Sequence, residues 1–195
     1  MTFDRKPAVI LVHGLWNTAN IFWRLRLYLE EQGWDVYTIN ITPNNGDIGI
    51  EQQAHQLQAF VEEVPTGQQS LSLLGFSMGG LVSRYYLQRL SGLQRVSRFV
   101  GVAVPHYGSA LAWFRWNIGG VQMRPGSLFL ADLNRDMEKL SACRPVFLWT
   151  PYDLLVLPAR HCCLPVGSNQ RLPVSSHNGM LRDKRSLAAI AQALT

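Results

Sequence analysis

Short apolar runs alternate with amphipathic stretches along the whole 195-residue chain, and this alternation limits the possible folds more than any other feature. The runs are rich in Val, Ile and Leu, and most lack a polar residue at every second position, as expected for strands buried on both faces of a parallel sheet. They occupy residues 8–12, 35–41, 70–74, 99–104, 146–149 and 169–174. This pattern predicts an α/β fold, with a mostly parallel central sheet of about six strands and helices on both faces.

The stretches between the runs carry apolar residues at helical spacing, which predicts helices that each bury one stripe. These lie around residues 21–28, 50–64, 78–85 and 180–194. Since the chain has no internal repeat and no linker, we expect a single domain over residues 1–195. Segment 109–135 breaks the alternation, with several aromatic residues and two glycine-containing breaks but no strand pattern. We predict one or two short helices there, forming an insert over the edge of the sheet.

The segment Gly75-Phe76-Ser77-Met78-Gly79 is a G-x-S-x-G motif that follows a predicted buried strand and precedes a predicted helix. In this context the motif forms a tight turn that holds the serine in a strained backbone conformation and presents its hydroxyl above the sheet. Ser77 is therefore the candidate nucleophile. The alternative is an ordinary glycine-rich turn in which Ser77 only caps the helix.

A tetrahedral oxyanion needs two fixed N–H donors. One is expected from Met78, the residue after the nucleophile, and the other from the loop after the first strand. Gly14 allows a sharp bend in that loop, so we assign the second donor to the Leu15 amide. His13 is expected to brace the loop; a role as catalytic base is the weaker alternative, because His13 precedes the nucleophile by a long stretch of chain.

Parallel-sheet enzymes with a G-x-S-x-G turn of this kind place their catalytic residues in the chain order Ser, acid, His. Among the acidic residues after Ser77, only Asp153 directly follows an apolar strand, and we predict it as the acid. The other acidic residues lie on predicted helices or lack a preceding strand: Asp132, Asp136, Glu138 and Asp183.

Three histidines follow the nucleophile. His177 lies between the last predicted strand and the last helix, on a loop that can reach Ser77, and is the candidate base. His161 follows Asp153 too closely and is interpreted as a packing residue. His106 is expected to line the pocket wall or to brace it by hydrogen bonds.

Together these motifs resemble the small bacterial lipases of the α/β-hydrolase superfamily, the compact group without a large cap domain. The resemblance extends over nearly the whole chain and rests on five segments in order, at residues 13–15, 75–80, 104–109, 150–158 and 176–177. Val104 departs from the threonine usual before Pro105 in that family. The resemblance implies a serine ester hydrolase of the esterase or lipase type, acting through an acyl-enzyme on Ser77.

The aromatic residues of the insert suggest an apolar surface over the active site, suited to an acyl chain and to transient contact with a lipid interface. The candidate substrate contacts are Trp16, His106, Trp113, Phe114 and Trp116. We therefore expect a lipase that acts on acyl-lipid (glycerolipid) esters. An acyl-protein or acyl-CoA thioesterase with the same triad is the nearer alternative, and a catalytically silent lipid-binding protein is the further one.

The net charge of +5 does not indicate a nucleic-acid partner, because the basic residues are scattered and no nucleic-acid module is recognisable. No apolar stretch reaches the roughly 20 residues that a membrane helix needs. Residues 1–6 form a short, polar stretch before the first apolar run, so no signal peptide is visible and a cytoplasmic location is expected. The predicted chemistry requires no metal or organic cofactor, and we expect a monomer.

Overall fold

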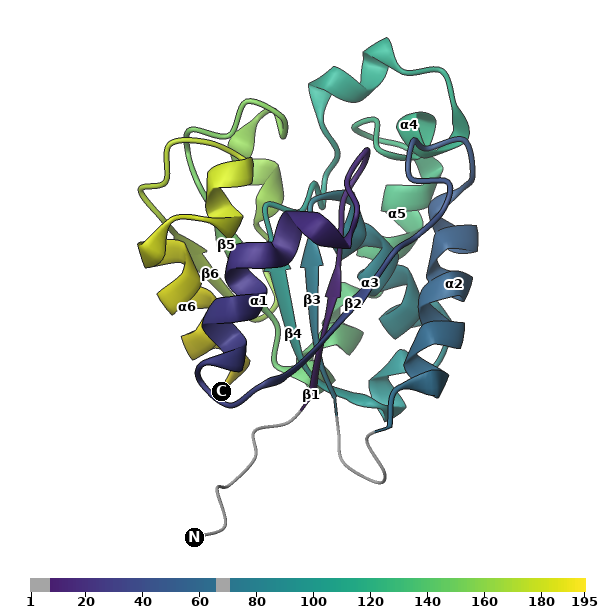
Figure 1. Ribbon diagram of the computed structural model, residues 1–195. Coiled ribbons are helices and arrows are strands. Elements are labelled where there is room, and N and C mark those ends of the chain that lie inside the picture. Colours follow the sequence, from purple (N-terminus) through teal and green to yellow (C-terminus); the bar gives the residue numbers. More distant parts are fainter. Residues whose placement is uncertain (1–7, 66–70) are drawn as a thin grey trace, which may run out of the picture.

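The computed structural model describes residues 8–65 and 71–195, and Figure 1 shows a central sheet between two layers of helices. The sheet has six strands in the order β2-β1-β3-β4-β5-β6, and every neighbouring pair is parallel. The strands are β1 (Ala8–Val12), β2 (Asp35–Ile39), β3 (Leu71–Phe76), β4 (Val96–Val102), β5 (Val146–Trp149) and β6 (Ser168–Arg171). The predicted fold class, a parallel sheet of about six strands with helices on both faces, is confirmed.

Most predicted strands lie within a few residues of their expected positions. Strands β1 and β5 have the predicted bounds, and β3 continues two residues further, to Phe76. Ser70, where β3 was expected to begin, lies outside the described residues. So do residues 1–6, which the signal-peptide prediction concerns. The prediction for the last strand was less accurate, because all four residues of β6 are exposed at the edge of the sheet. The apolar residues that suggested a buried strand, Leu172 and Val174, lie beyond its end and pack into the core.

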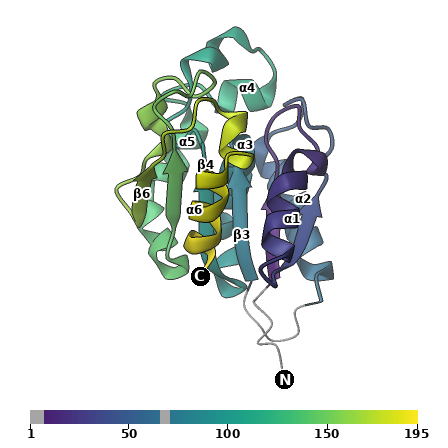
Figure 2. The same ribbon diagram turned by 60° about the vertical axis from the view of Figure 1, so that its left-hand side comes forward.

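Two helical layers cover the sheet (Figures 1 and 2). Helices α1 (Trp23–Glu30) and α6 (Lys184–Leu194) lie on one face, and α2 (Ile50–Glu63), α3 (Met78–Arg89) and α5 (Leu128–Arg135) lie on the other. Successive side chains of β1 serve both cores: Ile10 and Val12 pack under α2 and α3, whereas Val9 and Leu11 pack under α1 and α6. This double burial explains why the strands show no polar alternation.

The direction in which the chain adds strands reverses at β1. From β1 the chain moves outward to β2, then returns to place β3 on the other side of β1. Because such crossovers are right-handed, α1 and α2 lie on opposite faces of the sheet. A reversal of this kind leaves a crevice at the carboxyl ends of the two central strands, which is where α/β proteins bind ligands. The loops that begin after Val12 and Phe76 meet at this point.

The segment predicted as an insert contains more helix than expected. It forms a 3-10 turn (Ala110–Phe114), α4 (Ile118–Gln122) and α5, and Figure 2 shows α4 above the carboxyl ends of the strands. Its second half is part of the core, because Phe129, Leu130 and Leu133 of α5 are buried against the helical layer. Within residues 8–65 and 71–195, no helix is long and apolar enough to cross a membrane.

Candidate active site

Ser77 stands at a sharp turn between β3 and α3, as the motif predicted. Its backbone lies at φ 54° and ψ −126°, a conformation that L-residues rarely adopt. The turn is tight because α3 approaches β1 closely: a Cβ on Gly79 would lie 2.2 Å from the carbonyl oxygen of Val12. Although Ser77 precedes the first residue of α3, its side chain makes no capping hydrogen bond. The simple capping alternative therefore does not account for this serine.

Asp153 and His177 form a buried pair. The Asp153 Oδ2 and His177 Nδ1 atoms are 2.7 Å apart, and the two side chains are almost inaccessible to solvent. Because the carboxylate accepts this hydrogen bond, Nδ1 carries the proton and the other ring nitrogen, Nε2, is left to act as an acceptor. The ring also packs against Phe76, the residue before Ser77, with 4.8 Å between ring centroids.

The loop after β5 holds Asp153 in place through its own backbone. The second carboxylate oxygen, Oδ1, accepts hydrogen bonds from the amides of Leu155 (2.8 Å) and Val156 (2.9 Å). Ser109 braces the same loop from outside, since its hydroxyl donates to the Leu155 carbonyl (2.8 Å) and accepts from the Leu157 amide (3.1 Å). The Asp153 carboxylate is therefore held by three hydrogen bonds, from the two loop amides and the His177 ring, which satisfy its buried oxygens.

The amides of Leu15 and Met78 belong to the two loops that meet above β1 and β3. Across residues 8–65 and 71–195 the hydrogen-bond network gives neither amide an acceptor. Gly14 brings the first loop close to the nucleophile, because a Cβ at this position would lie 2.9 Å from the Ser77 Cβ. The next residue, Trp16, has a φ of 57° and donates its amide to the carbonyl of Asn44 at 2.8 Å, which fixes the bend.

His13 braces the first loop, as predicted. Its Nε2 accepts from the Ile41 amide at 3.0 Å, and its Nδ1 is 3.0 Å from the Gly14 carbonyl oxygen. Burial lowers the pKa of this imidazole, so it stays neutral while it joins the two segments. Since both ring nitrogens are engaged, His13 has no free position from which to act as a base. His161 is likewise a packing residue, with its Nδ1 2.8 Å from the Gly108 carbonyl oxygen.

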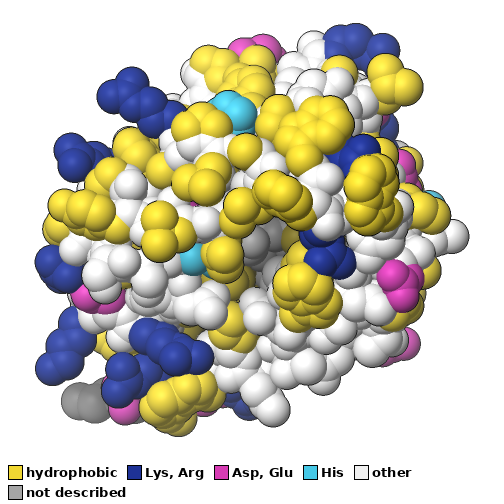
Figure 3. Space-filling model, turned by 90° about the horizontal axis from the view of Figure 1, so that it is seen from above, with side chains coloured by type: hydrophobic (Ala, Val, Ile, Leu, Met, Phe, Trp, Pro, Cys, Tyr) yellow, Lys and Arg dark blue, Asp and Glu magenta, His cyan; other side chains and the backbone are white. Residues whose placement is uncertain are grey.

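An open cavity of about 520 Å³ lies in front of Ser77 and His177. In the view from above, Figure 3 shows a hollow surrounded by hydrophobic side chains. The walls come from the loop after β1, the 3-10 turn of the insert and the loops after β5 and β6. Most lining residues are apolar, among them Leu15, Pro105, Leu111, Ala112, Met123 and Val156.

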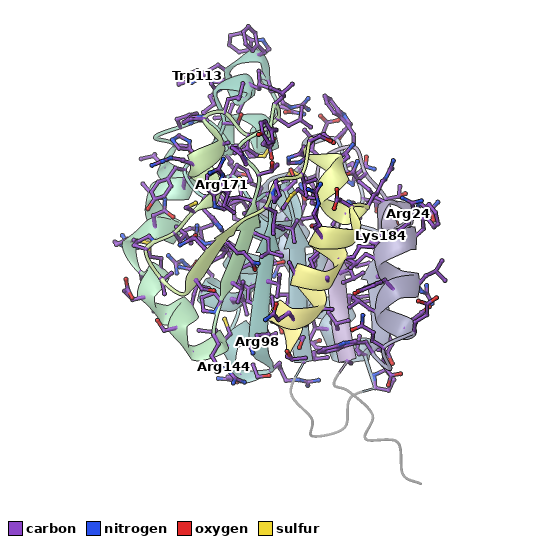
Figure 4. All side chains as sticks on the ribbon, turned by 90° about the vertical axis from the view of Figure 1, so that its left-hand side faces the viewer. Arg24, Arg98, Trp113, Arg144, Arg171 and Lys184 are labelled. Carbon is purple, nitrogen blue, oxygen red and sulfur yellow. The ribbon has the colours of Figure 1, made fainter. Side chains whose placement is uncertain are left out.

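The structure brings two of the five expected substrate contacts, Trp16 and Phe114, to this cavity. Trp113 instead lines a separate, more open hollow, and Figure 4 places it at the top of the molecule. Trp116 is 85% exposed and does not line the cavity. The tryptophans separate because the 3-10 turn and the extended residues after it point neighbouring side chains in different directions.

His106 is fully buried beneath the cavity rather than in its wall, and so serves as a brace. Its Nδ1 is 3.3 Å from Nη1 of Arg84, and its ring packs edge-on against Phe147. Burial and the adjacent guanidinium hold its pKa well below the usual value, so the ring is neutral. Arg84 also donates to the Leu133 carbonyl (2.7 Å) and the Asn134 side chain (2.9 Å), and thereby ties α3 to α5.

Sequence reasoning missed several polar residues of the cavity wall: Asn17, Ser109, Arg115 and Asn178. Arg115 lies among the aromatic residues of the insert, with its guanidinium carbon 4.3 Å from the centroid of the Trp16 ring. No motif indicated this contact, because the two residues are almost a hundred positions apart in the chain. The network as a whole has the parts needed for acyl transfer: a strained serine, an oriented imidazole and two available amides.

Comparison with known proteins agrees with this architecture. The family model described as the alpha/beta hydrolase fold matches residues 7–128. A triacylglycerol lipase from Pseudarthrobacter phenanthrenivorans is 37% identical over 114 residues, which is 54% of this chain and 35% of that protein. Palmitoyl-protein thioesterase 3 from Dictyostelium discoideum is 28% identical over 91 residues, which is 44% of this chain and 32% of that protein. The chain spans about a third of the length of these curated relatives.

Two solved structures cover nearly all of this chain. The mature form of the lipase BlEst2 from Bacillus licheniformis matches with a TM-score of 0.85 and 17% identity, over 98% of this chain and 93% of that one. Lipase B from Aspergillus fumigatus matches with a TM-score of 0.82 and 19% identity, over 97% of this chain and 52% of that one. At such identities the likeness concerns the fold alone. Because the family model matches more than half of this chain, the chain belongs to the alpha/beta hydrolase fold family.

Proposed function

We propose that this protein is a serine carboxylic-ester hydrolase of the lipase type, acting on acyl-lipid esters through an acyl-enzyme on Ser77. The observation that carries the proposal is the buried Asp153–His177 pair, whose imidazole lines the same cavity as a serine held at positive φ. The similarity to a triacylglycerol lipase supports the same class of reaction, and the solved structures support the fold on which it would take place.

In the proposed mechanism His177 Nε2 takes the hydroxyl proton of Ser77 as the oxygen attacks the ester carbonyl. The C–O bond to the alcohol then breaks, and the alcohol leaves with the proton that His177 returns. In the second half of the cycle His177 takes a proton from a water molecule as the water oxygen attacks the acyl-enzyme. The ester bond to Ser77 then breaks, His177 returns the proton to the serine oxygen, and the fatty acid is released. The amides of Leu15 and Met78 stabilise the oxyanion in both halves. Asp153 keeps the imidazole oriented and stabilises its protonated form.

The acyl preference follows from the shape and lining of the cavity. A volume of about 520 Å³ with mostly apolar walls fits a medium or long hydrocarbon chain better than an acetyl group. The exposed apolar residues around its mouth fit the further proposal that the protein contacts a lipid interface while it binds its substrate.

A thioesterase with the same three residues is the second candidate. It is favoured by the similarity to palmitoyl-protein thioesterase 3, which is weaker and shorter than the similarity to the triacylglycerol lipases. Oxygen and sulfur esters pass through the same acyl-enzyme, so this candidate differs from the first in its leaving group only.

The test measures hydrolysis of p-nitrophenyl esters from acetate to palmitate by the purified protein and by Ser77→Ala. We expect the highest kcat/KM on medium or long chains, and a loss of more than about 10⁴-fold in the variant. A matched palmitoyl thioester, compared with the palmitoyl oxygen ester, separates the two candidates.

The controls use a fluorophosphonate that labels activated serines. Labelling of Ser77 in the parent protein and none in Ser77→Ala is expected. Turnover that survives Ser77→Ala would contradict the proposed nucleophile. If no ester or thioester is cleaved and the fluorophosphonate does not react, the silent lipid-binding alternative replaces the hydrolase.

A further inference from the structure

Arg115 is a charged side chain in an otherwise largely apolar cavity. It lines the same cavity as Ser77 and His177, and it lies over the indole of Trp16, the neighbour of the proposed oxyanion donor Leu15. Figure 3 shows Lys or Arg atoms at the edge of the hollow, among the hydrophobic side chains. A guanidinium in this place is unnecessary for binding a neutral acyl chain, and bringing charge out of water carries a free-energy cost.

The hydrogen bonds of Arg115 leave part of its donor capacity unused. Nη2 donates to the carbonyl of Asn45 at 2.6 Å, which anchors the side chain against the loop after β2. Nε is buried without a partner, and within the described parts of the chain Nη1 has no acceptor. Since arginine carries donors in a fixed planar fork, a side chain anchored by one nitrogen keeps the other oriented.

The charge of Arg115 is not neutralised by a directly bound carboxylate among residues 8–65 and 71–195. The charge of Arg115 acts on Asp47, but this carboxylate is itself held by the side-chain amides of Asn117 (3.1 Å) and Asn45 (2.6 Å). These two hydrogen bonds are the main reason that the pKa of Asp47 is lowered, and the charge of Arg115 makes the smallest contribution. The guanidinium therefore keeps positive potential at the cavity wall.

We propose that Arg115 determines substrate specificity by binding the anionic headgroup, a phosphate in particular, of an acyl ester whose hydrocarbon chain occupies the apolar part of the cavity. Guanidinium and phosphate form charge-assisted hydrogen bonds that are stronger than neutral ones. The indole of Trp16, with its ring centroid 4.3 Å from the guanidinium carbon, also stabilises the cation. The proposal rests on the hydrolase function above and narrows its substrate class from glycerolipid esters in general to acidic ones.

Binding tests the inference without any need for hydrolysis. Isothermal titration calorimetry compares octyl phosphate, 1-octanol and inorganic phosphate on the intact protein. We expect octyl phosphate to bind at least about tenfold more tightly than octanol, as one charge-assisted hydrogen bond allows. It should also slow fluorophosphonate labelling of Ser77, since both occupy one cavity. Octyl phosphate bound no better than octanol, or inorganic phosphate bound as well as octyl phosphate, would overturn the proposal.

Arg24 supplies a matched control for variants. It is exposed on α1, where Figure 4 labels it, and lies over the ring of Trp23 at 5.1 Å, outside the cavity. Arg115→Met is expected to abolish the preference for octyl phosphate, whereas Arg24→Met, with the same change in net charge, leaves it intact. Arg115→Lys keeps the positive charge but lacks the planar guanidinium, and it should retain part of the preference for octyl phosphate. This variant also tests the role of Arg115 if Arg115→Met does not fold. Equal effects of Arg115→Met and Arg24→Met would contradict a specific contact.

The kinetic counterpart uses 1-octanoyl-glycerol and its 3-phosphate. The parent protein is expected to show the higher kcat/KM on the phosphate, and Arg115→Met to lower that value by about 10- to 100-fold while it changes the neutral ester little. A variant that slows both esters equally would assign Arg115 a purely structural role. Failure to cleave either ester would count against the hydrolase function, while the calorimetry still decides the role of Arg115.

Discussion

At the scale of single residues, hydrogen bonds restrain both carboxylate oxygens of Asp153. Its two carboxylate oxygens accept bonds from the amides of Leu155 and Val156 and from the ring of His177. An amide nitrogen in place of Oδ2 would offer the imidazole a hydrogen-bond donor instead of an acceptor. The ring would then be held in the opposite tautomer, with its proton directed toward Ser77.

Asp153→Asn should therefore lower kcat on p-nitrophenyl octanoate by about 10⁴-fold with little loss of folding. The reason is the wrong tautomer of His177, since the side chain keeps its volume and one acceptor oxygen for the loop amides. Steady-state kinetics measure the loss, and circular dichroism checks the fold. Near-normal activity in a folded variant would show that another carboxylate orients the base.

At the scale of elements, the site depends on how loops after different strands are joined. The loop after β4 carries Ser109, whose hydroxyl bonds both the carbonyl of Leu155 and the amide of Leu157 in the loop after β5. This contact connects the insert to the loop that carries the acid. Small shifts of that loop would move His177, because the imidazole takes its orientation from Asp153.

Ser109→Ala is expected to lower kcat by about 10- to 100-fold, because a displacement of the order of 1 Å in a catalytic group has such an effect. Ser127→Ala is the matched control: its hydroxyl likewise links two backbone groups, the Gln122 carbonyl and the Leu130 amide, but away from the acid loop. Both variants should lose similar thermal stability, and only Ser109→Ala should lose activity. Equal activities would disconnect Ser109 from the positioning of Asp153.

At the scale of the whole molecule, one face differs from the others. The face above the carboxyl ends of the strands gathers hydrophobic side chains around the hollow (Figure 3). Its exposed apolar residues come from separate loops and include Trp16, Phe114, Trp116 and Leu154. Arg115 also lies at this hollow, whereas the basic residues labelled in Figure 4 are spread along the molecule, from Arg24 and Lys184 to Arg98 and Arg144 at the far end of the sheet. An apolar face around a cavity suits contact with a lipid surface.

We expect Phe114→Ser combined with Trp116→Ser to weaken binding to phosphatidylcholine vesicles by about tenfold or more, because these residues are 82% and 85% exposed. Trp23→Ser, on α1, serves as the control for loss of an exposed aromatic ring. Vesicle co-sedimentation measures binding, and circular dichroism checks that the variants are folded. Unchanged sedimentation of the double variant would rule out this face as the lipid contact.

The order of the elements and the position of the strained serine could be predicted from the sequence, because both depend on local patterns. Apolar runs and helical stripes identify parallel strands and their crossovers, and the G-x-S-x-G motif identifies the turn at Ser77. The pairing of Asp153 with His177 could also be expected, since parallel strands bring the loops at their carboxyl ends to one edge. These three predictions did not require knowledge of how remote side chains pack.

Only the tertiary structure decided which side chains face the cavity. Contacts with Arg84 and Phe147 hold His106 beneath the cavity, although its loop borders the site. Trp113 and Phe114 are neighbours in sequence but line different hollows, because the 3-10 turn directs them apart. Arg115 reaches Trp16 through a contact between segments about a hundred residues apart in the chain. Periodicity records which face of an element is apolar, whereas such contacts depend on how remote elements pack against one another.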